Sequence, residues 1–363
     1  MKVLQILKPS GMGGVEKIAA DLHNYLISVE KEDAYIGISK EYIDVFKQSY
    51  NLVKEENIIP IDDENLLNMR KSYTKIIKKI KPDIVHTHAR KECVFIATCK
   101  SNFRHIRTQH MEEHNRIPKT VFEKIITRKN VDKWVCTSSQ LKNDYLNREG
   151  INLSKSTVIY NGVLNNKIDG YKGKIFNYED KLCLGFVGRL NKQKGLDILI
   201  SELSNIKNEC LNKIQLKVIG DGEEEETIKK QVKNSGLDKV VQFYGFKNDI
   251  INQIEKFDIL VMPSRNEGLP LVMLESMSTG TPVAIHDVGC ISEILSNGYN
   301  GWIIDNKENS WVDFIEDVIS KKYDLENISK KALETYKSRF TLEKMCSSYY
   351  KEYKKILCKE INK

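Results

Sequence analysis

The feature that most constrains the fold is a regular alternation of short apolar runs with longer amphipathic stretches. The runs, such as VLQIL at 3–7 and DILVMPS at 258–264, have the length of strands, and the stretches between them have helical spacing. Helices that connect parallel strands produce this rhythm, because each buries an apolar face against the sheet to which it returns. The alternation therefore predicts an α/β protein with mostly parallel sheets.

The alternation stops over residues 164–180, where the chain is polar, contains two glycines and has neither helical nor strand period. We interpret this segment as a linker between two doubly wound domains, which suits a chain of 363 residues. We expect an N-terminal domain at 1–165, a C-terminal domain at 166–340, and a helix at 341–363 that packs back toward the N-terminal domain. The expected strands are residues 3–7, 34–39, 57–61, 83–88, 105–110, 133–138 and 156–163, then 182–188, 215–220, 240–245, 258–264, 281–287 and 301–305.

Composition argues against several classes of protein. No apolar run approaches the ~18 residues that span a bilayer, and the start of the sequence, MKVLQIL, lacks a signal-peptide pattern. The eight cysteines form no CxxC pair, so neither a disulfide framework nor a zinc site is indicated. These features predict a cytoplasmic protein with reduced thiols.

The excess positive charge lies in the first half of the chain. Residues 1–165 hold 27 basic and 20 acidic residues, whereas the remainder holds 30 of each. Residues 65–133 hold 17 basic and 6 acidic residues, and the segment MRKSYTKIIKKIKP predicts a basic amphipathic helix. Its charged face is either merely solvated or binds an anionic membrane or lipid phosphate. We expect no nucleic-acid partner, because no recognisable nucleic-acid module accompanies the charge.

Two glutamates form the first candidate site. In PSRNEGLPLVMLESMS (263–278), Glu267 lies in an expected loop at the carboxyl end of a strand, and Glu275 lies in the helix that follows. The amides near Gly268 would form a helix N-terminus, which suits a phosphate, and a nearby carboxylate can accept hydrogen bonds from sugar hydroxyls. From spacing alone, a pair of solvated helix acids is an equal alternative.

Two further segments place basic residues or glycines where strands end. In GFVGRLNKQKG (185–195), Arg189 and Lys194 follow a strand, and a guanidinium with an ammonium can neutralise a diphosphate. In KPSGMGGVE (8–16), the glycines would let backbone amides approach an anion, although this is neither a dinucleotide fingerprint nor a P-loop. Each segment alone is also typical of an ordinary surface loop.

Together these segments resemble the retaining family 4 glycosyltransferases of the GT-B fold, also called glycosyl transferases group 1. The resemblance rests on GMGGVE, VIYNGV, GFVGRLNKQKG, VIGDGEEEETI, VQFYGFKND and the E-x7-E block NEGLPLVMLE, in this order along most of the chain. It implies two Rossmann-like domains that face each other across a cleft.

The resemblance also implies that the C-terminal domain binds a nucleoside diphosphate sugar, the donor. Arg189 and Lys194 would hold the diphosphate, Glu275 the ribose hydroxyls and Glu267 the donor sugar. The other implied donor-binding residues are Gly13, Gly14, Gly188, Phe246, Lys247, Gly268, Leu269, Leu271 and Val272. Phe246 and Lys247 would grip the base, and the rest would approach the sugar or the phosphates through their backbones.

A histidine completes the set of catalytic candidates, which are His110, Arg189, Lys194 and Glu267. His110, at the end of HIRTQH, matches the T-x-H position of the family, where it would face the reacting sugar or the acceptor. His86 and His88, in DIVHTH, are the rival histidines. Glu113 and His114 would shape the acceptor pocket.

The implied reaction transfers a sugar, with UDP favoured over GDP as its carrier, to a hydroxyl of a glycan or polyprenyl-diphosphate-linked acceptor, with retention of anomeric configuration. The sequence contains no DxD triplet, so no metal and no cofactor are expected. Bacterial surface polysaccharide biosynthesis is the expected setting, with peripheral contact at the inner face of the cytoplasmic membrane. A nucleotide-sugar 2-epimerase of the same fold and a non-catalytic transferase-like partner subunit are the alternatives.

Overall fold

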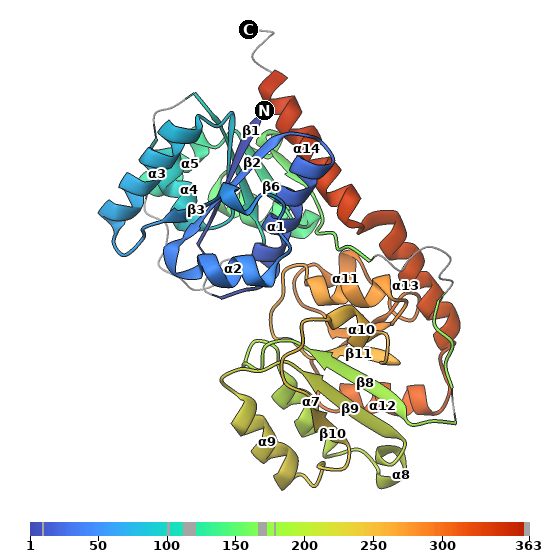
Figure 1. Cartoon of the computed structure of the whole chain (residues 1–363). Coiled ribbons are helices and arrows are strands. Elements are labelled where there is room, and N and C mark those ends of the chain that lie inside the picture. The colour runs from blue at the N-terminus through green and yellow to red at the C-terminus, as the bar shows by residue number, and fades with distance from the viewer. Residues whose placement is uncertain (9–10, 100–101, 112–120, 166–172, 178, 359–363) are drawn as a thin grey trace. The chain divides into compact units, whose positions relative to one another are not determined.

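The computed structural model describes residues 1–8, 11–99, 102–111, 121–165, 173–177 and 179–358. The chain forms two compact units (Figure 1). The N-terminal unit contains Met1–Gly162 together with the residues from Leu342 onward, and the C-terminal unit contains Val163–Thr341. Within the described ranges, no helix is both long enough and apolar enough to cross a membrane.

The N-terminal unit is built on a parallel sheet of seven strands in the order β3-β2-β1-β4-β5-β6-β7. β1 pairs with both β2 and β4, so the strand order reverses beside β1. Ligands of doubly wound sheets bind at the carboxyl ends of the strands near such a reversal. The strands are Lys2–Leu7 (β1), Asp33–Ser39 (β2), Ile58–Ile61 (β3), Ile84–Thr87 (β4), Arg104–Gln109 (β5), Lys133–Cys136 (β6) and Ser156–Val158 (β7).

Helices cover both faces of this sheet. α3, α4 and α5 lie on one face, and α1 and α14 lie on the other (Figure 1). Short 3-10 helices at Lys40–Tyr42, Glu55–Asn57 and Leu153–Lys155 join the elements. The α-helices are Gly14–Ser28 (α1), Ile43–Ser49 (α2), Leu66–Ile80 (α3), Arg90–Ala97 (α4), Val121–Asn130 (α5), Ser139–Glu149 (α6) and Leu342–Cys358 (α14).

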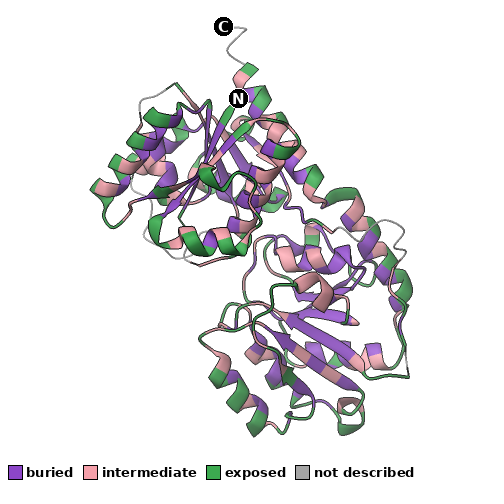
Figure 2. Cartoon of the chain, in the orientation of Figure 1, coloured by how far each residue is buried: buried purple, intermediate pink, exposed green. Residues whose placement is uncertain are grey.

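The basic amphipathic helix expected from the sequence is α3. Asn65 caps its first turn by accepting a hydrogen bond from the Asn68 amide. Tyr73, Ile76 and Ile80 turn toward the sheet and are buried, and the opposite side of the helix is exposed (Figure 2). The helical spacing of its apolar residues therefore anchors α3 to the core and leaves its lysines in solvent.

The final helix, α14, belongs to the N-terminal unit although the C-terminal unit precedes it in sequence. The Tyr353 hydroxyl lies 2.7 Å from His86 Nδ1, and the Tyr349 hydroxyl lies 3.1 Å from Thr108 Oγ1. His86 Nε2 lies 2.7 Å from the same threonine hydroxyl. All four side chains are buried, so this network ties α14 to β4 and β5.

The C-terminal unit is built on a parallel sheet of six strands in the order β10-β9-β8-β11-β12-β13. Apolar side chains of α7, α9 and α12 form one continuous core with the strands. The strands are Leu182–Val187 (β8), Ile214–Ile219 (β9), Val241–Phe243 (β10), Ile259–Met262 (β11), Val283–His286 (β12) and Trp302–Ile304 (β13). The helices are Leu196–Leu203 (α7), Asn208–Leu211 (α8), Glu225–Asn234 (α9), Ile250–Ile254 (α10), Leu271–Ser278 (α11), Ser310–Ile319 (α12) and Leu325–Arg339 (α13), with a 3-10 turn at Ile291–Glu293.

All thirteen expected strands are present, and the prediction of two doubly wound α/β domains is confirmed. The interpretation of 164–180 as a linker is wrong for its described second half. Phe176 is buried in the core of the C-terminal unit, and Lys174 forms an ion pair with Asp258 at 3.5 Å. An aromatic side chain in a polar stretch gains by burial, so residues 173–177 pack on that unit. Residues 166–172 and 178 lie outside the described ranges.

Candidate functional site

Most of the predicted donor-binding residues lie at one edge of the six-stranded sheet. Because the strands are parallel, the loops after β8, β10 and β11 leave the sheet at the same edge. The loop after β8 carries Gly188, Arg189 and Lys194, and the loop after β11 carries Glu267. We call this edge, with its loops, the C-terminal edge.

Lys194 and Glu267 form an ion pair across these two loops. The Lys194 Nζ atom lies 2.7 Å from Glu267 Oε1, and Ser264 Oγ donates a hydrogen bond to the same oxygen at 2.7 Å. Only 6% of the Glu267 side chain is exposed, against 22% of Lys194. A buried carboxylate needs such partners to remain charged. The structure therefore joins two residues that the sequence predicted separately.

A second ion pair fastens the same two loops together. The Arg265 guanidinium donates two hydrogen bonds of 2.7 Å to the carboxylate of Asp197, near the start of α7. These hydrogen bonds lower the pKa of the Asp197 carboxyl below its usual value. Arg265 also donates to the Lys192 carbonyl at 2.7 Å. Bidentate pairing fixes geometry, so Arg265 holds the loop that carries Lys194 against the loop that carries Glu267.

Two glycines permit the close approach of backbones around this pair. Gly195 has a φ of +68°, and a Cβ there would lie 2.0 Å from the carbonyl oxygen of Pro263. Gly289 has a φ of +61°, and a Cβ there would lie 2.2 Å from the carbonyl oxygen of Glu267. Only glycine fits both the left-handed backbone and these contacts. A larger residue at either position would push the loop that bears Glu267 out of place.

Arg189 has surroundings that differ from those of Lys194. It follows Gly188 at the end of β8, and its side chain is exposed. Within the part of the chain that the structure describes, no carboxylate forms an ion pair with its guanidinium. The charge of Lys194 is already balanced by Glu267, whereas the charge of Arg189 is available to an anion.

The start of α11 supplies backbone donors at the same edge. The helix begins directly after Pro270, and the amides of its first turn have no carbonyl partner within the helix. Their partial positive charge favours an anion. Glu275 lies about one turn further along and is half-buried. The predicted backbone contacts of this segment are at Gly268, Leu269, Leu271 and Val272, of which Leu269 has a buried side chain.

Phe246 and Lys247 lie at the far end of this edge. They follow β10, the outermost strand, and β9 separates β10 from β8. Both side chains are exposed, with 65% of Phe246 accessible to solvent. An exposed aromatic ring offers a face on which a base can stack. The structure thus places the pair at the C-terminal edge, after its outermost strand.

Gly13 and Gly14 form the start of α1 in the N-terminal unit. Both are exposed, and Gly13 is the N-cap residue of the helix. Glu16, at the third helical position, is buried, and this burial raises the pKa of its carboxyl. A glutamate at that position reaches back to the N-cap amide, as in a capping box. The protein's own carboxylate therefore occupies part of the anion-attracting end of α1.

His110 directly follows β5 in the N-terminal unit and is half-buried. Its Nε2 atom lies 3.0 Å from Nδ1 of His88, which follows β4, and the two rings stack at a centroid distance of 5.3 Å. Burial lowers the pKa of His110 to about 3 and the pKa of His88 well below its usual value. His86, in contrast, has both ring nitrogens engaged by Tyr353 and Thr108 and serves to hold α14.

Glu113 and His114, predicted to shape the acceptor pocket, lie outside the described residues. Three residues at the C-terminal edge were not found from the sequence: Ser264, Arg265 and Asp197. Their only signal was proximity to Glu267 or Lys194 along the chain, and spacing does not reveal a bond between two loops. Among the described residues, no group of three or more histidine, cysteine or acidic side chains is arranged to hold a metal ion.

The fold and this edge define a class of protein, the GT-B glycosyltransferases. Residues 12–164 match the model described as Glycosyltransferase Family 4, and residues 168–335 match the model described as Glycosyl transferases group 1. An uncharacterised glycosyltransferase of Methanocaldococcus jannaschii is 30% identical over 301 residues, which cover 80% of each chain. The chain belongs to the family 4 glycosyltransferases.

Two further proteins illustrate the likeness. An Escherichia coli enzyme named UDP-Gal:alpha-D-GlcNAc-diphosphoundecaprenol alpha-1,3-galactosyltransferase is 27% identical over 278 residues, which cover 69% of this chain and 70% of the enzyme. HepE of Anabaena, crystallised with UDP, superposes with a TM-score of 0.81 at 18% identity, over 98% of this chain and all of HepE. At that identity, the superposition establishes the common fold.

Proposed function

We propose that this protein is a retaining glycosyltransferase that moves a sugar from a UDP-sugar to a hydroxyl of a glycan or polyprenyl-diphosphate-linked glycan. Family membership carries the transferase activity. The choice of UDP is supported by HepE, which was crystallised with UDP and with UDP-glucose. The acceptor class is supported by the E. coli relative that acts on a sugar-diphosphoundecaprenol. The proposed setting is bacterial surface polysaccharide biosynthesis in the cytoplasm.

The C-terminal edge has the charges that a nucleoside diphosphate sugar requires. Arg189 offers an unbalanced guanidinium, and Lys194 can turn from Glu267 to a phosphate oxygen a short distance away. Glu267 would then accept hydrogen bonds from donor-sugar hydroxyls, and Glu275 would accept them from the ribose. Phe246 and Lys247 would hold the base, and Gly13 and Gly14 would approach the phosphate.

The transfer step breaks the bond between the anomeric carbon and the diphosphate oxygen. The acceptor oxygen forms its bond to that carbon on the same face, and its proton passes to the leaving diphosphate. Arg189, Lys194 and the first amides of α11 stabilise the negative charge that develops on the diphosphate. These groups supply the positive charge that a metal ion would otherwise bring, so we propose that no metal ion and no cofactor is needed.

His110 is the proposed contact of the N-terminal unit with the reacting sugar or the acceptor. It lies at the carboxyl end of β5, one strand from the reversal of strand order next to β1. Its low pKa keeps the ring neutral at physiological pH, so it can accept a hydrogen bond from a hydroxyl without adding positive charge.

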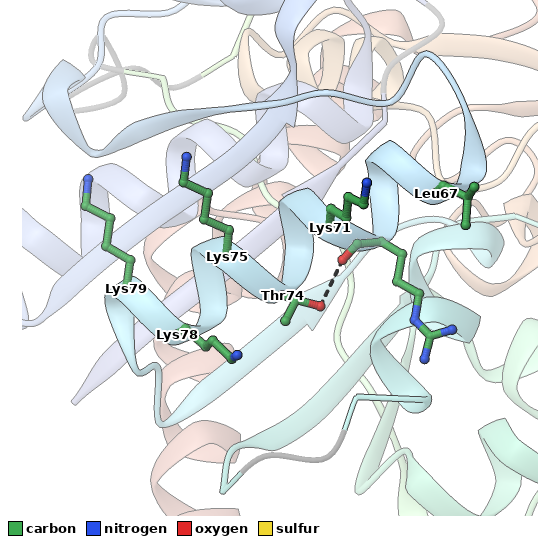
Figure 3. Close-up of a pocket in the computed structure, with 7 residues that line it drawn as sticks. Leu67, Lys71, Thr74, Lys75, Lys78 and Lys79 are labelled. Carbon is green, nitrogen blue, oxygen red and sulfur yellow. Dashed lines mark hydrogen bonds between the residues drawn. The ribbon is translucent and has the colours of Figure 1, made fainter.

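The exposed side of α3 is the proposed contact with an anionic membrane. This basic face consists of Arg70, Lys71, Lys75, Lys78 and Lys79, all exposed. Figure 3 shows the side chains of Lys71, Lys75 and Lys79 projecting on one side of the helix, as their spacing of four residues requires. Each lysine near an anionic bilayer contributes about 1 kcal/mol to binding.

Exposed apolar side chains lie close to this basic face. Leu66 and Leu67, in the first turn of α3, are 62% and 72% exposed. Arg70 of α3 and Phe122 of α5 line one hollow, and Phe122 is 61% exposed. Basic and apolar side chains side by side suit a surface with anionic headgroups above acyl chains.

A thermal-shift screen tests the donor. The purified protein is heated with UDP, GDP, ADP, CMP and their common sugar conjugates, each with and without Mg²⁺. A ligand at a hundredfold excess over its Kd stabilises the folded state by about 2.7 kcal/mol, so we expect a clear rise in Tm with UDP and a UDP-sugar, independent of Mg²⁺. A rise with GDP alone, or only with Mg²⁺, would contradict the donor or the metal-free mechanism.

Vesicle flotation at low salt tests the membrane contact. We expect binding to vesicles that contain phosphatidylglycerol and none to pure phosphatidylcholine. Replacement of Lys71, Lys75 and Lys79 by glutamine should abolish flotation. The matched control replaces three exposed lysines of α9, Lys229, Lys230 and Lys233, and should float like the wild type. Equal loss in both triple variants would show that total charge, and not the face of α3, governs binding.

A further inference from the structure

Three polar side chains, one within β1 and one directly after each of β4 and β5, form a continuous series of hydrogen bonds. Gln5 lies within β1, His88 directly follows β4 and His110 directly follows β5. His88 Nε2 lies 3.2 Å from Gln5 Oε1, and His88 Nδ1 lies 3.0 Å from His110 Nε2. We call this series the histidine relay.

The orientation of the Gln5 amide sets the direction of the relay. Its Nε2 group donates a hydrogen bond of 2.9 Å to the carbonyl of Ala19 in α1. The reversed amide would place two oxygens against each other, so Oε1 is the atom that faces His88. An amide oxygen only accepts. His88 must therefore carry its proton on Nε2 and donate it to Gln5.

One proton on His88 then determines the proton on His110. His88 is only 5% exposed, and burial keeps its pKa well below the usual value, so the ring carries a single proton. With Nε2 protonated, Nδ1 of His88 is an acceptor. His110 must donate to it from Nε2. The neutral His110 ring therefore has no proton on its own Nδ1.

That nitrogen, His110 Nδ1, has no hydrogen-bond partner within the described part of the chain. Among the described residues, no group donates a hydrogen bond to His110 Nδ1, although the atom is shielded from solvent. A buried hydrogen-bond acceptor without a donor lowers the stability of the fold. The hydroxyl of a ligand could donate the hydrogen bond that this nitrogen lacks. His86, two residues before His88, has partners at both nitrogens and offers no such acceptor.

We propose that Gln5 and His88 are positioning residues that hold His110 as the Nε2–H tautomer, so that its bare Nδ1 accepts a hydrogen bond from a sugar hydroxyl. The inference about the hydroxyl rests on the proposed sugar transfer. The assignment of the tautomer does not, because it follows from the geometry of the free protein. The two can therefore fail separately.

The first measurement is the tautomer. In the wild-type protein with ¹⁵N-labelled histidine, two-bond proton–nitrogen correlation spectra distinguish a protonated ring nitrogen from a bare one. We expect Nε2–H at both His88 and His110, with assignments made from His88→Gln and His110→Gln spectra. A proton on His110 Nδ1 in the wild-type protein would overturn the proposal.

The second measurement breaks the relay at its origin. Gln5→Met keeps the size of the side chain and removes the acceptor for His88, so both tautomers of His88 and His110 become accessible. We expect a mixed His110 spectrum and a fall in kcat of threefold or more in a protein that remains folded at the assay temperature, with a Tm lowered no more than that of Tyr353→Phe, which also removes a buried hydrogen bond. An unchanged spectrum and an unchanged kcat would overturn the positioning role.

His105 provides the matched control. It is a buried histidine on β5 whose Nδ1 also lacks a hydrogen-bond partner within the described residues, but it lies at the opposite end of the strand. His105→Gln should leave the His110 spectrum and kcat unchanged. A fall in kcat equal to that of Gln5→Met would show that any disturbance of the buried histidines has this effect, which would contradict the relay.

A third measurement identifies the molecule that carries the hydroxyl. The ¹⁵N chemical shift of His110 Nδ1 is recorded with the nucleotide sugar that raises Tm most and with the corresponding free nucleotide. A change in this chemical shift with the nucleotide sugar but not with the free nucleotide places the hydroxyl on the transferred sugar. No shift with either ligand, together with the fall in kcat of Gln5→Met, places the hydroxyl on the acceptor. If the tautomer is as expected but no nucleotide binds, the proposed function fails and the relay stands.

Discussion

The carboxyl edges of the two sheets differ in how they satisfy their polar groups. At the C-terminal edge, Lys194 is paired with Glu267 and Arg265 with Asp197. At the seven-stranded edge, within the described residues, His110 Nδ1 and both carboxylate oxygens of Glu92 have no hydrogen-bond partner. Burial raises the pKa of the Glu92 carboxyl and lowers the pKa of His110. The C-terminal edge thus pairs its buried charges, whereas the carboxyl edge of the seven-stranded sheet includes buried groups, His110 and Glu92, that burial drives toward neutrality.

This difference teaches what each edge can bind. A diphosphate can exchange with a carboxylate as the partner of a lysine, so the charged edge suits an anionic ligand. Neutral acceptors such as a bare imidazole nitrogen suit hydroxyls, which bring a proton but no charge. Under the proposed function, the charged edge would bind the nucleoside diphosphate sugar and the neutral acceptors of the other edge would accept hydrogen bonds from hydroxyls.

The largest expected effect comes from removing the two cations of the C-terminal edge. Lys194→Ala should lower kcat/KM by about 10²–10³-fold, the loss typical of a donor that stabilises a developing anion. It should also lower the free energy of unfolding by about 2 kcal/mol, because buried Glu267 is left without its partner. Arg189→Ala should lower kcat/KM by about 10–100-fold with unchanged unfolding, because its side chain is exposed.

Steady-state kinetics and urea unfolding of both variants check this pair of expectations. The double variant Lys194→Met with Glu267→Gln should recover most of the stability but none of the activity. If Lys194→Ala and Arg189→Ala lose stability equally, the ion pair does not stabilise the edge as argued.

Lowering the pH should destabilise the N-terminal unit more than the C-terminal unit. Five histidines of the N-terminal unit have pKa values lowered by burial, against His286 alone among the described residues of the C-terminal unit. A histidine whose folded pKa lies below its unfolded value of 6.5 stabilises the fold above pH 6.5, and this stabilisation is lost as pH falls. Each such histidine lowers the free energy of unfolding by about 1 kcal/mol as the pH falls from 7 to 5.5. Glu16, Asp21 and Glu92, whose carboxyl pKa values are raised by partial or full burial, offset part of the loss.

Hydrogen exchange measured by mass spectrometry tests this difference in acid stability, because the peptides of each unit are measured separately. We expect exchange in the strands of the N-terminal unit to accelerate, relative to intrinsic rates, more than in the C-terminal unit as the pH falls from 7 to 5.5. Equal acceleration in both units would mean that the buried histidines do not control acid stability.

The contrast between the edges also shows what the sequence could reveal. Period and turn residues are local, so the thirteen strands and the position of each motif at a strand end were predictable. The Lys194–Glu267 contact joins two loops far apart in sequence, and Gln5 acquires its role only from Ala19 and His88. The burial of Phe176 was not predicted, because a single aromatic residue among polar neighbours produces no helical or strand period. The partners of a polar side chain depend on strand order, which spacing along the chain does not encode.

A smaller effect is expected from loosening the loops of the C-terminal edge. Arg265→Ala removes the bidentate bond to Asp197 and the bond to the Lys192 carbonyl. The loop that bears Lys194 should then sample more positions, and KM for the nucleotide sugar should rise about tenfold, a cost of about 1.4 kcal/mol. Lys322→Ala, which removes an exposed ion pair with Asp317 in the same unit, is the control and should leave KM unchanged.

The last expected effect is on stability alone and concerns the attachment of α14 to the N-terminal unit. Tyr353→Phe leaves buried His86 Nδ1 without the hydroxyl that lies 2.7 Å away, which should lower the free energy of unfolding by about 1–2 kcal/mol. Tyr350→Phe, one turn earlier, removes a hydrogen bond of 3.1 Å to Glu32 near the surface and should cost less than about 0.5 kcal/mol. Urea unfolding measures both values, and hydrogen exchange should place the loss in β4, β5 and α14 alone. If Tyr353→Phe, like Tyr350→Phe, costs less than about 0.5 kcal/mol, then apolar packing holds α14 and the buried hydrogen bond to His86 contributes little to stability.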